Sequence, residues 1–294
     1  MRVGVVVLPT DPWPETRDRA RRVEALGYAH LWTYDHLSWR RYRDRDWQAT
    51  VPWLAALAVS TSRIRLGTMV ASPNFRHPVT LAKEAMTLDR LSEGRFVLGV
   101  GAGGPGYDAG VLGGPTLSPG ERADRLDEFV EVLDLLLRQP LTSHDGTHYT
   151  VVEARMLPGC VQVPRVPMAL AATGPRGMAL AASRAESWIT YGALSGGDLG
   201  PAGAEAVVTA QVVTLDAACD RAGRDPASID RILLVTNEVE RPLAGLEAFR
   251  DFAGRYRALG FTDLVFHHPR ADDPVWDDDE TMVEVVAAIL PELA

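Results

Sequence analysis

Short apolar runs alternate with amphipathic helical patterns along nearly the whole chain, and this alternation restricts the possible folds more than any other feature. Buried strands are indicated at Val3–Leu8, His30–Tyr34, Ile64–Val70, Phe96–Val100, Met168–Ala172, Ser187–Tyr191, Ile232–Thr236 and Thr262–Phe266. A helix is expected after each strand, at Pro14–Leu26, Trp47–Ser60, Pro78–Leu91, Pro119–Leu137, from Pro175, and at Gly203–Ala222, Leu243–Leu259 and Asp278–Ala288. Eight such pairs in 294 residues favour a closed parallel barrel over an open doubly wound sheet. We therefore predict an α/β fold, a (β/α)8 barrel of the TIM type.

Two longer stretches, Gly101–Gly120 and Gln139–Pro167, fall outside the alternation. The first is rich in glycine and is not expected to open a helix. The second contains Thr142–Thr150 and Val161–Val163, and we expect these segments to make a small hairpin before the fifth barrel strand. No internal repeat or low-complexity linker interrupts the sequence, so we expect residues 1–294 to form a single domain.

The charge balance argues against two classes of partner. The chain has 30 basic and 39 acidic residues and a net charge of −9, so we expect neither a nucleic acid nor an anionic membrane as its main partner. No signal-peptide pattern precedes Val3–Leu8, and no apolar run approaches the roughly 18 residues of a membrane span. Cys160 and Cys219 form no CxxC motif, which favours a reducing compartment. We expect a cytoplasmic protein.

In a barrel of this type the active site lies at the carboxyl ends of the strands. The corresponding segments are Pro9–Pro12, Asp35–Trp39, Ala71–Arg76, Gly101–Tyr107, Thr173–Gly177, Tyr191–Gly197, Asn237–Glu240 and His267–Arg270. The only lysine, Lys83, lies instead inside the third predicted helix. Schiff-base chemistry is therefore disfavoured, because it requires a lysine in the site.

Asp35 and His36 are the first candidates for catalysis. An aspartate beside a histidine at a strand's carboxyl end can act as a general base or bind a heterocycle, although a capped loop with a solvated histidine has the same pattern. Trp39–Arg45 follows with four arginines, which could grip an anionic group or form a solvated loop.

Two glycine-containing turns are candidates for binding a ring or a phosphate. Gly101–Gly106 spells GxGxxG after a strand but opens no predicted helix, so a close approach to bare backbone and a flexible turn are both open. Ala172–Gly177 places Thr173 or Gly174 before a helix that starts at Pro175, and Arg176 adds a cation. Free N–H groups at such a helix start favour a phosphate site, and an ordinary helix cap is the alternative.

His267 and His268 follow the eighth strand. With Asp35 and His36 they could in principle ligate a metal, but few carboxylates accompany them, and we predict no metal site. A substrate contact and a structural role are both open for these histidines.

Several stretches carry a family resemblance: Leu26–His36, Arg63–Val70, His77–Pro78, Leu81–Lys83, Leu88–Arg95, Leu98–Gly103 and Leu259–Arg270. Together they resemble the luciferase-like monooxygenase superfamily, and the specific part is the long central stretch from Arg63 to Gly103. Members fold as (β/α)8 barrels and use either FMN or the deazaflavin coenzyme F420. The Asp35–His36 pair resembles the F420-dependent branch, in which these residues lie beside the ring.

The resemblance implies an F420-dependent oxidoreductase that transfers a hydride between the deazaflavin and a small organic substrate, as a reductase or a dehydrogenase. Asp35 and His36 are the expected catalytic residues, with His36 as the proton partner. Met69–Val70 matches a position where that branch often has a non-prolyl cis peptide behind the ring. The expected cofactor contacts are Asp35, Met69, Val70, Gly101, Ala102, Gly103, Ala172, Thr173, Gly174, Pro175, Arg176, Gly177, Tyr191 and Gly192. The expected substrate contacts are Trp39, His267 and His268.

The chain departs from the family pattern at Gly104, where some F420-dependent dehydrogenases place a catalytic glutamate. This puts a sugar-phosphate dehydrogenase in doubt. The alternatives are an FMN-dependent monooxygenase supplied by a flavin reductase, a metal-dependent hydrolase or isomerase using His36, His267 and His268, and a cofactor-free binding protein. Family members commonly dimerise, so a homodimer is expected.

Overall fold

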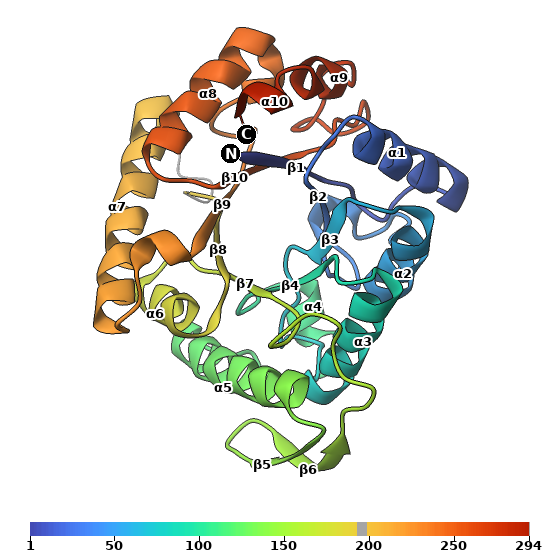
Figure 1. Cartoon of the computed structure of the whole chain (residues 1–294), viewed down its shortest axis with the longest axis vertical. Helices are drawn as coiled ribbons and strands as arrows, with labels where there is room; N and C mark the ends of the chain where they lie inside the picture. Colours follow the sequence, from blue (N-terminus) through green and yellow to red (C-terminus); the bar gives the residue numbers. More distant parts are fainter. Residues whose placement is uncertain (193–198, 294) are drawn as a thin grey trace. The chain divides into compact units, whose positions relative to one another are not determined.

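The computed structural model describes residues 1–192 and 199–293. Within this part of the chain, eight parallel strands form a closed barrel in the order β1-β10-β9-β8-β7-β4-β3-β2 (Figure 1). The strands are β1 (Arg2–Val6), β2 (His30–Thr33), β3 (Arg65–Thr68), β4 (Phe96–Val100), β7 (Met168–Ala171), β8 (Ser187–Thr190), β9 (Asp230–Leu234) and β10 (Asp263–His267). The predicted (β/α)8 fold is confirmed, and each strand lies within about two residues of its predicted position.

Helices follow the strands as the alternation predicts. They are α1 (Trp13–Ala25), α2 (Thr50–Ser60), α3 (Pro78–Leu91), α5 (Pro119–Arg138), α6 (Pro175–Arg184), α7 (Gly200–Arg221), α8 (Leu246–Ala258) and α9 (Met282–Ala287). Short pieces add α4 (Tyr107–Gly110), α10 (Leu290–Leu293) and the 3-10 turns η1 (Arg40–Tyr42), η2 (Pro226–Ser228) and η3 (Pro242–Ala244). At α5 a capping box fixes the start: Ser118 accepts from the Glu121 amide, and the Glu121 carboxylate accepts from the Ser118 amide.

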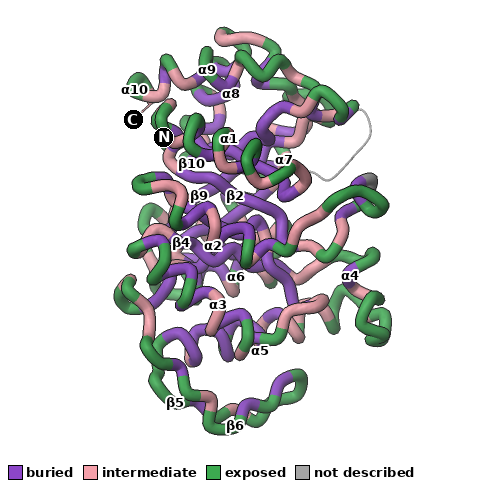
Figure 2. Tube along the Cα trace, turned by 90° about the vertical axis from the view of Figure 1, so that its right-hand side faces the viewer, coloured by how far each residue is buried: buried purple, intermediate pink, exposed green. Residues whose placement is uncertain are grey.

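The barrel strands are buried along most of their length, as Figure 2 shows for β2, β4 and β9. Strands buried on both faces need near-continuous apolar sequence, which explains why the short runs were recognisable without alternation.

By length and composition α7 is, among the described helices, the one that could cross a membrane. A barrel helix that packs against its neighbour α6, as α7 does, meets the same criteria, so the observation is weak evidence for a span.

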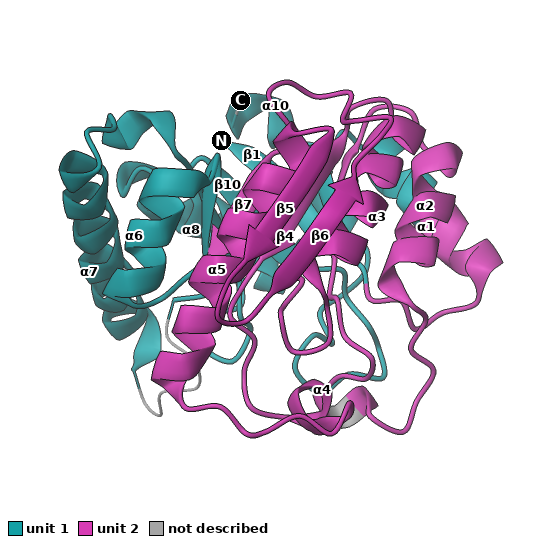
Figure 3. Cartoon of the chain, turned by 90° about the horizontal axis from the view of Figure 1, so that it is seen from below, with its two compact units in different colours: residues 1–7, 20–32, 172–294 teal, residues 8–19, 33–171 magenta. Residues whose placement is uncertain are grey.

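The chain divides into two compact units (Figure 3). Unit 1 comprises Met1–Val7, Ala20–Trp32 and Ala172–Ala294, and unit 2 comprises Leu8–Arg19 and Thr33–Ala171. In unit 1, β1 pairs with β10 and β2, and β9 pairs with β10 and β8. In unit 2, β4 pairs with β3 and β7.

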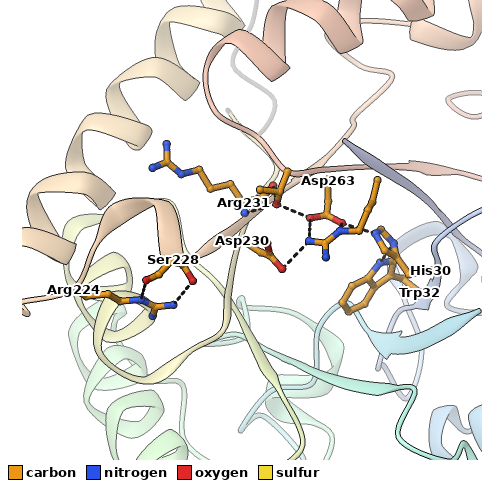
Figure 4. Close-up of polar contacts among 9 residues, drawn as sticks. His30, Trp32, Arg224, Ser228, Asp230, Arg231 and Asp263 are labelled. Atoms are coloured by element: carbon orange, nitrogen blue, oxygen red, sulfur yellow. Dashed lines mark hydrogen bonds and ion pairs between the residues drawn. The ribbon is translucent and has the colours of Figure 1, made fainter. Parts of the chain in front are cut away.

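A polar network around the buried carboxylate of Asp263 joins strand starts in unit 1 (Figure 4). The Asp263 carboxylate on β10 accepts from His30 Nε2 at 2.8 Å and from the Arg2 guanidinium at 2.7 and 2.6 Å. Trp32 Nε1 donates to His30 Nδ1 at 2.7 Å. An indole N–H only donates, so Nδ1 of His30 carries no proton and Nε2 donates to Asp263.

The hairpin before the fifth barrel strand exists, but the predicted second arm is wrong. Its strands are β5 (Leu141–Asp145) and β6 (Thr150–Arg155), paired antiparallel, rather than a pairing that includes Val161–Val163. The Glu128 carboxylate on α5 holds the hairpin tip by accepting from the amides of His148 and Tyr149, each at 2.8 Å. The amides of Val161 and Gln162 donate to Asp89 on α3 at 2.6 and 3.0 Å, and that contact uses the donors a strand would need.

Lys83 lies on α3 as predicted, and its ammonium closes the base of this hairpin. Nζ donates to the carbonyl of Arg155 at 2.9 Å and to that of Leu157 at 3.0 Å. The lone lysine is therefore a structural cation of unit 2.

Candidate active site

The loop that follows β2 brings His36 into a cluster of aromatic rings in unit 2. Trp39 stacks on the imidazole, with ring centroids 6.3 Å apart and an interplanar angle of 27°. Tyr34 and Trp47 each approach it edge-on at 6.2 Å. Trp47 Nε1 also donates to the His36 carbonyl at 2.8 Å, which holds the backbone as well as the ring. We call Tyr34, His36, Trp39, Tyr42 and Trp47 the aromatic cluster.

The His36 side chain is 32% exposed, and its Nδ1 hydrogen-bonds the carboxylate of Asp108. Asp108 is buried on α4, and its second oxygen accepts from the Leu37 amide at 3.0 Å. The sequence prediction missed Asp108, and the prediction that the glycine-rich stretch holds no helix was wrong at Tyr107–Gly110. A carboxylate shortly after the glycines that end β4 was the available signal, since it lies at the same barrel end as His36.

Asp35, the other predicted catalytic residue, lies in a different environment. Its side chain is 1% exposed and makes a bidentate pair with Arg76, with Nε–Oδ2 and Nη2–Oδ1 distances of 2.9 and 2.6 Å. Burial lowers the pKa of Arg76, but the hydrogen bonds and charge of Asp35 outweigh burial and raise it. Both carboxylate oxygens thus serve a buried ion pair that ties the β2 loop to the segment before α3.

Glycines let the ends of β3 and β4 approach closely. The peptide bond between Met69 and Val70 is cis, which confirms the expectation drawn from the family resemblance. A Cβ on Gly99 would lie 1.8 Å from the Thr68 carbonyl oxygen, and one on Gly101 would lie 2.7 Å from Val70 Cγ2. No side chain other than hydrogen fits at these two positions without displacing a neighbour.

After Gly101 the backbone becomes progressively more exposed. Ala102 and Gly103 are half-buried, and Gly103 has φ of +71°, with Asn74 packed where a Cβ would lie. Asn74 Nδ2 donates to the Gly104 carbonyl at 3.0 Å, and Asn74 Oδ1 accepts from Arg125 Nη2 at 2.8 Å. A Cβ on Gly104 would meet no atom within 4 Å, so the surface there is bare backbone.

Arginines of the Trp39–Arg45 run lie over aromatic rings. The guanidinium of Arg40 lies 5.3 Å from the Trp39 ring, and that of Arg43 lies 5.2 Å from the ring of Tyr107. Arg45 lies 5.4 Å from the Tyr42 ring. The Arg41 side chain is outside the described part of the structure. These contacts give the described cations a packing role beside the aromatic cluster.

In unit 1, the turn that we predicted to bind a phosphate lies at the start of α6. Gly174 is the N-cap residue and no side chain caps the helix, while Pro175 occupies the first turn, as predicted. The surrounding residues Thr173, Gly174, Pro175 and Arg176 are exposed, and Ala172 and Gly177 are half-buried. Backbone N–H groups at this ten-residue helix start are suited to an anion, although an uncapped helix has the same geometry.

Tyr191 and Gly192 follow β8 in unit 1. Tyr191 is half-buried, and Gly192 is buried with φ of +70°. Gln211 on α7 donates to the Gly192 carbonyl at 3.1 Å and fixes this turn. The remainder of the predicted segment, 193–197, lies outside the described residues.

His267 and His268 are each 3% exposed within unit 1. The His267 ring stacks on Trp276 with centroids 3.8 Å apart and an interplanar angle of 19°. His268 Nδ1 lies 3.1 Å from the Pro269 carbonyl oxygen, so Nδ1 carries the proton. This burial favours the structural alternative over a substrate contact. Among residues 1–192 and 199–293, no three His, Cys, Asp or Glu side chains are grouped to hold a metal ion.

Both the sequence and the fold are similar to those of known proteins. A sequence profile described as luciferase-like monooxygenase matches residues 1–241. An F420-dependent glucose-6-phosphate dehydrogenase of Microbacterium testaceum is 32% identical over 213 residues, which cover 72% of this chain and 60% of that protein. The protein with the same name from Beutenbergia cavernae is 35% identical over 167 residues, covering 56% and 49%. The chain therefore aligns with about half to three-fifths of each of these relatives.

Among solved structures, the coenzyme F420 dependent tetrahydromethanopterin reductase from Methanopyrus kandleri superposes with a TM-score of 0.77. The match covers 100% of this chain and 99% of that one, at 18% sequence identity. It agrees with the closed barrel described above.

Proposed function

Because the chain belongs to the luciferase-like monooxygenase family, we propose that it is an oxidoreductase that uses coenzyme F420 and a small organic substrate. The observation that carries the proposal is the sequence similarity to the two F420-dependent relatives. When bound, the cofactor would supply the hydride chemistry, and the protein would position the reactants and move the accompanying proton.

The residues of unit 2 fit a flat, hydrogen-bonding ring. His36 presents a partly exposed imidazole held by aromatic neighbours, and the backbone at Gly104 is bare. Met69, Val70 and Gly101–Gly103 are proposed contacts of the ring. Ala172–Gly177, Tyr191 and Gly192 remain proposed contacts of the phosphate-bearing part of the cofactor.

His36 is the proposed proton partner. Its Nδ1 is bonded to Asp108, so Nε2 is the atom that would take a proton from the substrate or return one to it. Asp35 is committed to Arg76, and we propose that it positions the loop rather than exchanging a proton. Trp39 is kept as a proposed wall of the substrate pocket.

We do not propose glucose 6-phosphate, the substrate in the names of the two relatives, as the substrate of this protein. The position after the β4 glycines is Gly104, without a carboxylate, and the lone lysine is engaged at the hairpin base. We propose a hydride transfer to or from a small organic molecule, in a cytoplasmic homodimer whose assembly can be checked by light scattering.

The first experiment is a side-by-side titration of the purified protein with F420 and FMN. Binding of F420 in preference to FMN is the expected result. Preference for FMN would shift the assignment to a monooxygenase that needs a flavin reductase, and oxygen consumption with reduced FMN would then test it. Binding of neither would contradict both cofactor assignments.

The role of His36 is tested by His36→Ala, with His148→Ala as the matched control on an exposed histidine of the same unit. A panel of small alcohols and carbonyl compounds is screened for a change in F420 absorbance, and the best substrate is used. We expect turnover to fall by about 100-fold or more in His36→Ala with F420 affinity kept, and no change in His148→Ala. Unchanged turnover in His36→Ala would remove the proton role.

A further inference from the structure

We propose that Asp108 is a positioning residue that holds His36 as the tautomer protonated on Nδ1, leaving Nε2 as the atom that exchanges the proton. This inference rests on the proposed function for its chemical purpose. Its geometry stands on contacts within unit 2.

The two oxygens of Asp108 contact different donors. Oδ1 accepts from the Leu37 amide at 3.0 Å, and Oδ2 faces His36 Nδ1. An ionised carboxylate can only accept hydrogen bonds, so Nδ1 must carry the hydrogen. The amide fixes the orientation of the carboxylate, and the carboxylate fixes the tautomer of the ring.

Because the Asp108 carboxylate is buried, water molecules cannot easily replace its two protein donors. The Asp108 side chain is 7% exposed, whereas that of His36 is 32% exposed. A buried carboxylate without partners is costly, so Asp108 favours the states in which both donors face it. The exposed part of His36 is thereby left for an incoming group.

The aromatic cluster packs around the His36 imidazole and holds it against Asp108. Trp39 stacks on the imidazole, and Trp47 contacts it in a T-shaped arrangement. A rotation of the ring by half a turn would place a carbon against Asp108 Oδ2 and lose the hydrogen bond. Packing and hydrogen bonding therefore select the same orientation.

Asp108→Asn separates the hydrogen bond to Leu37 from the control of the His36 tautomer, because the asparagine amide has one accepting and one donating end. If the oxygen keeps the Leu37 amide, the NH₂ group faces His36 Nδ1 and favours the opposite tautomer, protonated on Nε2. Asp108→Glu keeps a carboxylate that accepts at both oxygens. Asp145→Asn, on an exposed aspartate of the same unit, controls for the loss of one charge.

The test is ¹⁵N-detected imidazole NMR of the whole protein, with the His36 signals assigned by their absence in His36→Ala. We expect the Nδ1–H tautomer in the wild type, in Asp145→Asn and in Asp108→Glu, and a shift toward Nε2–H in Asp108→Asn. Turnover of Asp108→Asn should fall by about 100-fold, with the Kd for F420 changed by less than about threefold.

The NMR readout distinguishes failure of this inference from failure of the proposed function. An unchanged His36 tautomer in Asp108→Asn, in a sample that still binds F420, overturns the positioning role. A tautomer shift in a protein that binds no F420 supports the positioning role and removes the proposed cofactor. Loss of the Nδ1–H form in Asp108→Glu would also contradict the inference, because that variant retains the accepting group.

Discussion

Two histidines at opposite ends of β2 each pair with an aspartate, and the surroundings of the two pairs differ. His30 begins the strand and contacts Asp263 in unit 1, with side-chain exposures of 6% and 2%. His36 lies beyond its carboxyl end and contacts Asp108 in unit 2, where the imidazole is 32% exposed. The first pair is almost fully buried, and the second includes an imidazole side chain that is partly exposed.

The comparison teaches that the residue pair alone does not define a role. At the start of a barrel strand, a buried polar network ties strands together and contributes stability. At the carboxyl end, the same chemistry with an exposed edge can act on a ligand. Substitutions in the two pairs test this division.

Removal of the Asp263 charge should cost the most stability. In Asp263→Asn the negative charge beside Arg2 is lost, and a single oxygen remains to accept from His30 and the Arg2 guanidinium, where the NH₂ group opposes one of these donors. We expect the free energy of unfolding in urea to fall by about 3–5 kcal/mol. Asp220→Asn, on an exposed residue of unit 1, should change it by less than about 0.5 kcal/mol. Similar losses in both variants would contradict the structural role of the network.

Acid should remove part of the same contribution. Burial raises the pKa of Asp263, but the hydrogen bonds from His30 and Arg2 outweigh burial and hold the pKa at about 2, below its ordinary 3.8. The folded pKa is depressed, so the stabilisation is complete above about pH 4 and is lost as the pH falls toward 2. We expect about 2 kcal/mol to disappear in that window. Parallel stability profiles for the wild type and Asp263→Asn across it would refute the assignment.

Trp32→Phe should expose the contribution of a single hydrogen bond in the network. It leaves His30 Nδ1 without the donor that now lies at 2.7 Å. We expect a loss of about 1–2 kcal/mol beyond that of Trp53→Phe. Trp53 is the matched control, because it is also buried and its Nε1 makes no hydrogen bond within the described residues. Equal unfolding free energies for the two variants would show that the indole hydrogen bond contributes nothing.

Asp108→Asn should have the smallest effect on stability, below about 1 kcal/mol, because His36 is partly solvated and asparagine can still accept from the Leu37 amide. The measurement is the same urea titration. A loss as large as that of Asp263→Asn would erase the distinction between the two pairs and mark both as structural.

The sequence was sufficient for the barrel because buried parallel strands are short apolar runs, and those runs are local signals. The hairpin partner was harder to predict. Whether Val161–Val163 pairs as a strand depends on Asp89, a residue more than 70 positions away that takes its amides. Such long-range contacts leave no local pattern.

The candidate site shows the same limit. His36 could be selected because it follows a strand end, but its partner Asp108 is 72 residues away on a four-residue helix. Asp35 was selected for the same reason as His36, and its pairing with Arg76, 41 residues away, became visible only in the structure. His267 also lies at the end of a strand, and its stacking on Trp276 depends on packing that the position alone does not reveal.

Lys83 carries the only primary amine among the side chains of this protein. Its two hydrogen bonds to the carbonyls of Arg155 and Leu157 must open before an acylating reagent can react with Nζ. The rate of acylation therefore reports how often the segment leaving β6 separates from α3. Measured on the peptide that contains Lys83 after digestion, so that acylation of the Met1 α-amine is not counted, that rate would follow local opening at one known position.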